Sequence, residues 1–226
     1  MPVQDDAREN ELIELFGLAR PANASRGGLD AELVLDGVRY EFELKSTTNG
    51  SVTTVRDFGP DHIAKWRGKH WLIGVYDTRQ QLQYCLHGTP ALMDPWIDEK
   101  AEYIRLDFRL ATILPQRVVL ADLHQLLGSK AVYSLEDAQF VQKRQYSAED
   151  YRAKMDRPGS YSPQRMVEIL SERSKYLIER GSTLNNPHIP ASYFEGWPHI
   201  DANHAEALRT NLRGLAANPE APAGQP

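Results

Sequence analysis

The chain has 226 residues, of which 41% are hydrophobic and 25% charged, and its formal net charge at pH 7 is −5. This composition is typical of a globular protein and excludes collagen-like, coiled-coil and wholly disordered classes. A single cysteine, Cys85, excludes an internal disulfide and a zinc site built from cysteine pairs.

The predicted elements begin with a helix over 6–18, followed by a Pro- and Gly-rich loop over 21–28. An Asp36-Gly37 pair then predicts a β-hairpin of strands 29–35 and 38–45. A polar, threonine-rich connection over 46–59 leads to a short helix that begins at Pro60, and two strands follow over 70–77 and 81–87. We therefore expect an α/β protein (α+β mixed), with a mixed central sheet flanked by helices in a core of residues 1–90.

The rest of the chain is predicted to be mainly helical. The expected helices are 90–114 with breaks, 120–127, 135–145, 148–155 and 163–180, and Ser162 is placed to cap the last of them. Residues 91–214 would thus form a helical extension of the same domain. From 215 to 226 the composition is that of a disordered tail.

The hairpin has two chemically different faces. With a two-residue turn, Leu35 pairs with Val38, and each further pair lies one residue outward on both strands, as far as Asp30 with Glu43. Side chains along each strand alternate between the two faces. One face holds the residues able to pack a core: Leu29, Ala31, Leu33, Leu35, Val38, Tyr40, Phe42 and Leu44. The other holds Asp30, Glu32, Arg39, Glu41, Glu43 and Lys45, with only Val34 apolar. A slip of one residue would bury the charges, so the register is well specified.

On the charged face, two of the expected cross-strand pairs consist of two acids: Asp30 with Glu43, and Glu32 with Glu41. Like charges at such positions are destabilising. A divalent cation between Asp30 and Glu43 would remove the repulsion, and Mg²⁺ is suited to a few oxygen ligands that leave room for waters. Lys45 lies on the same face, where its amine could position or deprotonate an attacking water. The alternative is a solvated hairpin face, with basic side chains neutralising its acids.

Asp30 and the run Glu43-Leu44-Lys45 resemble the signature of the PD-(D/E)xK nuclease superfamily, in which an acid opens one hairpin strand and E-x-K closes the next. The family pattern often has Pro before the acid, where this chain has Leu29. The resemblance covers roughly residues 6–87. It implies a restriction-endonuclease-like core made of a helix, a three-stranded meander, a second helix and a parallel strand.

The same resemblance implies the site residues. Asp30, Glu43 and Lys45 would be catalytic, and Mg²⁺ would be held by Asp30, Glu43 and the backbone carbonyl of Leu44. A glutamate from the first helix, Glu11 or Glu14, would be an auxiliary acid.

A compact core without a P-loop or helicase motif is similar to type II restriction endonucleases. The chain would then be a homodimer that cuts a short palindromic site in double-stranded DNA, with a cognate DNA methyltransferase in the same system. Candidate DNA contacts follow the catalytic strand: Ser46, Thr47, Thr48, Asn49, Thr53, Thr54, Arg56, Lys65, Arg67 and Lys69. A second candidate DNA surface, for which a solvated helix face or a dimer contact is the alternative, comprises Lys143, Arg144, Arg152, Lys154 and Arg157.

Two other functions stay open. One is a structure-specific nuclease, such as a junction resolvase or a repair nicking enzyme. The other is a non-catalytic binding module that keeps the nuclease-like hairpin as a scaffold. Other candidate residues have simpler interpretations: His188, His199 and His204 as surface or core histidines, Cys85 beside His87 as a buried strand cysteine, and Trp66, Trp71, Trp96 and Trp197 as packing residues.

The net charge of −5 does not exclude a DNA partner, because the charge is unevenly distributed. Residues 1–50 hold ten acidic and five basic side chains, and the remaining stretches sum to zero. Two of those stretches, 51–80 and 141–180, are locally basic, at +2 and +3. We therefore expect DNA binding that is weak without a divalent ion, because Asp30 and Glu43 would repel the phosphate. The N-terminus is acidic, unlike a signal peptide, and no membrane-length apolar run occurs, so a cytoplasmic location is expected.

Overall fold

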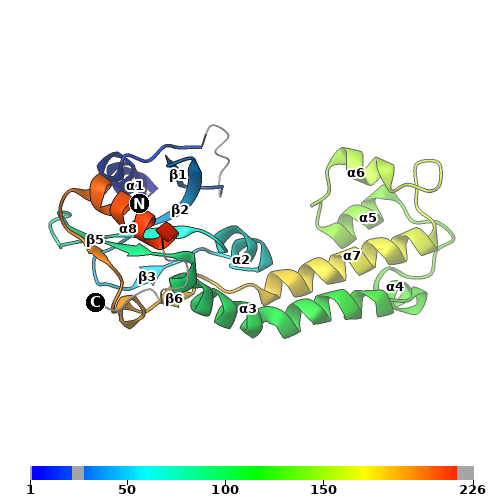
Figure 1. Cartoon of the computed structure of the whole chain (residues 1–226). Coiled ribbons are helices and arrows are strands. Elements are labelled where there is room, and N and C mark those ends of the chain that lie inside the picture. The colour runs from blue at the N-terminus through cyan, green and yellow to red at the C-terminus, as the bar shows by residue number, and fades with distance from the viewer. Residues whose placement is uncertain (1, 22–27, 218–226) are drawn as a thin grey trace. The chain divides into compact units, whose positions relative to one another are not determined.

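The computed structural model describes residues 2–21 and 28–217, so most of the predicted loop 21–28 and the tail from 218 lie outside the described residues. The described chain is mixed α/β and contains a five-stranded mixed sheet in the order β1-β2-β4-β5-β7. It divides into two compact units (Figure 1). The first comprises residues 1–101 and 184–226, and the second comprises residues 102–183.

The predicted hairpin and its register are confirmed. Strands β1 (Ala31–Leu35) and β2 (Val38–Thr47) pair antiparallel, from Leu35 opposite Val38 to Ala31 opposite Phe42. Asp36 and Gly37 both have positive φ, 50° and 81°, as a type I′ turn requires. The turn therefore sets the positions of Asp30, Glu43 and Lys45 along the two strands.

Strand β2 is central in the sheet, as predicted. On its other side it pairs in parallel with β4 (His70–Tyr76), reached through helix α2 (Pro60–Trp66), which has Pro60 in its first turn. β5 (Leu82–Gly88) continues antiparallel to β4. A strand held on both sides gives Glu43 and Lys45 a fixed backbone.

Helices cover both faces of the sheet (Figure 1). Helices α1 (Pro2–Phe16) and α8 (His204–Ala217) pack against the face that presents Phe42, Leu44 and Leu72. Helix α2 and the start of α3 (Pro90–Ile113) pack against the other face through an aromatic cluster that includes Trp66, Trp71 and Trp96. These tryptophans, like Trp197, are buried packing residues, as predicted. Because side chains alternate along β2, the hydrophobic core fixes one face while Glu43 and Lys45 point to the other.

At the edges of this unit the structure differs from the sequence-based expectations. Residues 52–53 (β3, Val52–Thr53) lie in the stretch expected to be a polar connection, and they pair with β6 (His188–Ile189) in a separate two-stranded sheet. Strand β7 (His199–Ile200) pairs with β5. The short helix Ala191–Phe194 and α8 lie in the same unit, so residues 184–217 belong to the first unit. Residues 215–217 are helical rather than part of a tail, and Val38 is 51% exposed because it borders the turn.

The second unit is helical, as expected. It contains the end of α3, a 3₁₀ turn (Leu114–Arg117), α4 (Leu120–Leu127), α5 (Leu135–Gln142), α6 (Ala148–Ala153) and α7 (Pro163–Ser182). Ser162 caps α7 by accepting a hydrogen bond from the N–H of Arg165. Tyr133, Tyr161 and Met166 are fully buried in its separate core. Among the described helices, none has the length and apolar character needed to cross a membrane.

Candidate active site

Asp30 is fixed beside the end of the hairpin. It directly precedes β1, whose last described pair is Ala31 with Phe42. One carboxylate oxygen, Oδ2, accepts a hydrogen bond of 2.9 Å from the backbone N–H of Leu44. The acid that precedes one strand is therefore tied to the residue between Glu43 and Lys45 on the other.

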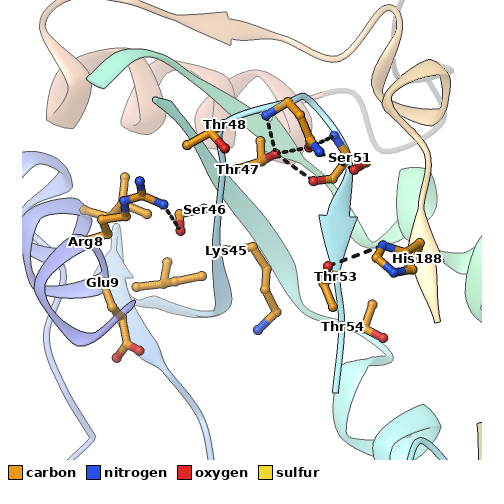
Figure 2. Close-up of a pocket in the computed structure, with 13 residues that line it drawn as sticks. Arg8, Glu9, Lys45, Ser46, Thr47, Thr48, Ser51, Thr53, Thr54 and His188 are labelled. Carbon is orange, nitrogen blue, oxygen red and sulfur yellow. Dashed lines mark hydrogen bonds between the residues drawn. The ribbon is translucent and has the colours of Figure 1, made fainter. Parts of the chain in front are cut away.

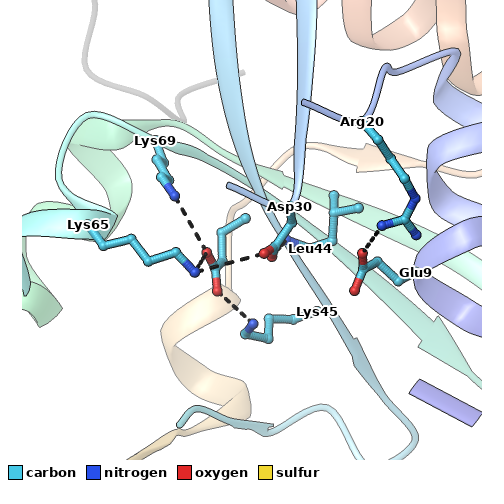
Figure 3. A network of polar contacts seen from close by, with 8 residues as sticks. Glu9, Arg20, Asp30, Leu44, Lys45, Lys65 and Lys69 are labelled. Atoms are coloured by element: carbon cyan, nitrogen blue, oxygen red, sulfur yellow. Dashed lines mark hydrogen bonds and ion pairs between the residues drawn. The ribbon is translucent and has the colours of Figure 1, made fainter. Parts of the chain in front are cut away.

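Glu43 forms ion pairs with three lysines, Lys45, Lys65 and Lys69. Figure 3 shows these lysines around Asp30 and Leu44. The side chain of Glu43 is 1% exposed, and its Oε1 accepts a hydrogen bond of 2.7 Å from Lys45 Nζ. Lys65 Nζ lies 3.3 Å from Glu43 Oε2 and 3.9 Å from Asp30 Oδ1, and Lys69 Nζ lies 3.9 Å from Glu43 Oε2. Two sequence-predicted DNA contacts, Lys65 and Lys69, are thus directed at the carboxylates.

The surroundings separate the pKa values of the two acids. Burial acts to raise the pKa of Glu43, but the ammonium groups of Lys45, Lys65 and Lys69 outweigh it and lower this pKa. Burial, followed by the charge of Glu43, raises the pKa of Asp30, and the positive groups nearby offset this only in part. The fold therefore favours the ionised form of Glu43 and disfavours that of Asp30, and further positive charge beside Asp30 would act against the second effect.

Lys45 is held as an ammonium. Burial acts to lower its pKa, but the charges of Glu43 and Asp30 outweigh burial and raise it. In this environment Lys45 is a hydrogen-bond donor and a positive charge rather than a base.

The donor set fits an oxygen-coordinated cation such as Mg²⁺. Asp30 Oδ2 and Glu43 Oε1 are engaged, which leaves Asp30 Oδ1 and Glu43 Oε2 as the available oxygens. Glu43 Oε2 is buried and accepts no hydrogen bond within the described chain, although Lys65 and Lys69 face it as charges. Because the N–H and C=O of one strand residue point to the same side, we expect the Leu44 carbonyl on the side of β2 that faces Asp30. An ion held by two side-chain carboxylates and one carbonyl would keep waters in its other positions, as Mg²⁺ does. Among residues 2–21 and 28–217, three or more His, Cys, Asp or Glu side chains that could hold a metal do not gather at one point.

The second acid pair on the hairpin needs no cation. Arg39 lies 2.6 Å from Glu32 and 3.5 Å from Glu41, so one guanidinium is shared by both carboxylates and offsets part of their charge. For Glu32 and Glu41 the structure agrees with the alternative interpretation of the hairpin, a solvated face whose acids are balanced by a basic residue.

Helix α1 contributes a glutamate near the site, but it is Glu9 rather than Glu11 or Glu14. Burial and the charge of Asp30 raise the pKa of Glu9, partly offset by Arg20, whose guanidinium donates to Glu9 over 3.0 Å. Glu11 instead accepts a hydrogen bond from the hydroxyl of Tyr76, and Glu14 is exposed. The sequence holds a signal for Glu9, because positions 9, 12 and 16 share one helical face and positions 12 and 16 are apolar. The structure buries both of these apolar residues, Leu12 and Phe16.

A polar pocket of about 510 Å³ opens beside Lys45 (Figure 2). Arg8 and Glu9 of α1 lie on one side, and Thr53, Thr54 and His188 lie on the other. Six predicted DNA contacts line the pocket together: Ser46, Thr47, Thr48, Asn49, Thr53 and Thr54.

Five residues of the pocket were not predicted as site residues: Arg8, Glu9, Leu12, Ser51 and His188. Arg8 donates to Ser46 Oγ over 3.2 Å, and His188 Nδ1 lies 3.3 Å from the hydroxyl of Thr53. The pairing of β3 with β6 brings His188 to this wall, which its position in the sequence did not indicate.

Other predicted contacts lie elsewhere. Arg56 is exposed and does not line this pocket, and Arg67 forms ion pairs with Asp94 and Asp98 of α3. In the second candidate DNA surface, Lys154 is paired with Glu172 inside the helical unit. Cys85 is fully buried, and burial raises the pKa of its thiol to about 12, which agrees with an inert strand cysteine.

No family model matches the sequence, and the comparison with curated proteins finds no match.

Proposed function

We propose that this protein is a Mg²⁺-dependent type II restriction endonuclease that hydrolyses phosphodiester bonds at a short palindromic sequence in double-stranded DNA. One observation carries the proposal: Asp30 is hydrogen-bonded to Leu44, between Glu43 and Lys45, and Lys45 lies in the wall of a hydroxyl-rich pocket. The parallel pairing of β2 with β4 through α2 supports the restriction-endonuclease-like core that the sequence resemblance implies.

Each residue has a role that its environment supports. Bound Mg²⁺ would supply an activated water and positive charge at the phosphate. Asp30 Oδ1, Glu43 Oε2 and the Leu44 carbonyl would hold the ion. Lys45, as an ammonium with three N–H donors, would orient a water or stabilise the charge that develops on a phosphate oxygen.

The pocket accounts for recognition of the sugar–phosphate backbone. Its hydroxyl and amide groups are donors of the kind that bind phosphate oxygens, and Arg8 adds a positive charge. In the proposed homodimer, one such site would cut each strand, and a cognate methyltransferase would protect the host sequence.

The test is digestion of a phage DNA of known sequence in Mg²⁺. We expect discrete fragments, and we expect Asp30→Asn and Lys45→Ala to abolish them, while the exposed controls Asp107→Asn and Lys175→Ala retain them. Bands that persist in the site variants would contradict the proposal. Preferential cutting of branched DNA would instead identify a structure-specific nuclease. Absence of cleavage together with unchanged thermal stability across a Mg²⁺ titration would identify a binding module.

A further inference from the structure

Lys65 faces both of the carboxylate oxygens that remain for a metal ion. Its Nζ lies 3.3 Å from Glu43 Oε2 and 3.9 Å from Asp30 Oδ1. The other oxygen of each acid is engaged, by the N–H of Leu44 and by Lys45. An amine thus faces the same two atoms that would ligate a divalent cation (Figure 3).

The three lysines differ in how they reach the acids. Lys45 belongs to the central strand and bonds Glu43 Oε1, and Lys69 approaches Glu43 without an ion pair to Asp30. Lys65 alone of the three forms ion pairs with both carboxylates. It therefore joins two like charges that would otherwise repel each other.

The side chain of Lys65 is also placed so that its ammonium group can move away from the two carboxylates. It lies in the last turn of α2, and the next residue, Trp66, is fully buried and fixes the backbone. The side chain of Lys65 is 20% exposed, whereas that of Lys69 is 6% exposed. A flexible four-carbon stem allows the ammonium to move while the helix stays in place.

We propose that Lys65 is an internal counter-ion of the metal site, which bridges Asp30 and Glu43 in the metal-free protein and is displaced when a divalent cation binds. This inference rests on the proposed function, because it takes both acids as metal ligands. An ammonium and a divalent cation repel each other and cannot share the same two oxygens. Lys65 therefore keeps the ligands together before the ion arrives, and it weakens binding of that ion.

The test is calorimetric titration of Ca²⁺ and Mg²⁺ into the full-length protein without DNA. We expect Lys65→Met to bind both ions at least about tenfold more tightly than the wild type, since an ion no longer has to displace an ammonium. Lys65→Arg should remain close to the wild type. Lys69→Met should bind more tightly by a smaller factor than Lys65→Met, and the exposed control Lys175→Met should be unchanged.

Thermal unfolding gives a second readout. In EDTA, Lys65→Met should melt at a lower temperature than the wild type, because the two acids lose the cation between them, and Ca²⁺ should restore the loss. Lys65→Gln, whose amide keeps a hydrogen-bond donor, replaces Lys65→Met if the latter does not fold by circular dichroism.

The outcomes separate this inference from the proposed function. If the wild type binds Ca²⁺ and cuts DNA, but neutral variants at position 65 bind the ion no more tightly, the counter-ion role is overturned and the nuclease remains. A wild type that neither binds divalent ions nor cuts DNA overturns both.

Discussion

The backbone N–H of Leu44 donates a hydrogen bond of 2.9 Å to Asp30 Oδ2. This bond crosses from the start of one strand to the end of its partner. It holds Asp30 where it faces the same lysine as Glu43, Lys65, although the two acids are thirteen positions apart in the sequence. The geometry of the candidate site therefore depends on the hairpin register.

Neutralising the two acids should have opposite effects on stability. Because burial and the charge of Glu43 raise the pKa of Asp30, the folded state disfavours its ionised form at neutral pH, and Asp30→Asn should raise the free energy of unfolding in EDTA. Because three ammonium groups lower the pKa of buried Glu43 against the effect of burial, Glu43→Gln should lower that free energy by about 3 kcal/mol. Urea denaturation at pH 7 measures both changes, and shifts of the same sign would contradict this electrostatic account.

The buried pair His70 and His87 should make folding sensitive to acid. Their rings are joined Nδ1 to Nε2 over 3.1 Å. Burial lowers the pKa of His70 to about 4 and, with the charge of His70, that of His87 to about 3. Both therefore bind protons more readily in the unfolded chain, where histidine titrates near pH 6.5. Their contribution to stability is complete above pH 6.5 and is lost as the pH falls through the window down to about 3.

His70→Gln should flatten this dependence. Between pH 6.5 and 4 we expect the wild type to lose on the order of 3 kcal/mol more stability than the variant, as the shift at His70 alone implies. The exposed control His199→Gln should follow the wild type. Parallel stability curves for the wild type and His70→Gln, measured by urea denaturation, would show that the buried ring is not the cause.

The hairpin was predictable because its determinants are local. Asp36-Gly37 fixes the turn, and the alternation of apolar and charged side chains fixes the faces, both within seventeen consecutive residues. Strand β7 and its pairing with β5 were not predictable in this way. Two residues, His199–Ile200, are too short for a periodic pattern, and their partners lie more than a hundred positions earlier.

The site itself was predictable only in part. The positions of Asp30, Glu43 and Lys45 follow from the register, but Lys65 and Lys69 belong to α2 and the turn after it. Their direction depends on how α2 packs through Trp66 against Trp71 of β4, which is tertiary information. Glu9 was missed because the sequence interpretation did not distinguish which of three closely spaced glutamates lies on the face of α1 that meets the sheet.

The second acid pair offers a test of the cross-strand charges. Arg39→Met should destabilise the protein by about 0.5–1 kcal/mol, because Glu32 and Glu41 lose their shared guanidinium at a half-exposed site. Glu41→Lys in that background should recover the loss by placing opposite charges across the strands. A double-mutant cycle in urea measures the coupling. Equal stability of Arg39→Met and the wild type would mean that this pair is fully screened by solvent.

DNA affinity should depend on divalent ions. In EDTA the lysines that surround Asp30 and Glu43 are engaged with these carboxylates rather than with a phosphate. Ca²⁺ adds positive charge at the two acids and should strengthen binding of a cognate duplex by about tenfold or more. Asp30→Asn should bind more tightly than the wild type in EDTA and respond less to Ca²⁺. Fluorescence anisotropy at fixed ionic strength measures both, and affinity that does not change with Ca²⁺ would contradict the assignment of these acids to metal.

The most direct test of the central claim is single-turnover cleavage of one mapped duplex site by the wild type and Asp30→Asn in parallel, in Mg²⁺ and in EDTA. The arrangement of Asp30, Glu43 and Lys45 predicts cleavage by the wild type in Mg²⁺ alone, with a rate at least about 10³-fold lower for Asp30→Asn, because a ligand of the activating ion is lost. Cleavage by the wild type in EDTA, or by a folded Asp30→Asn at the wild-type rate, would contradict it.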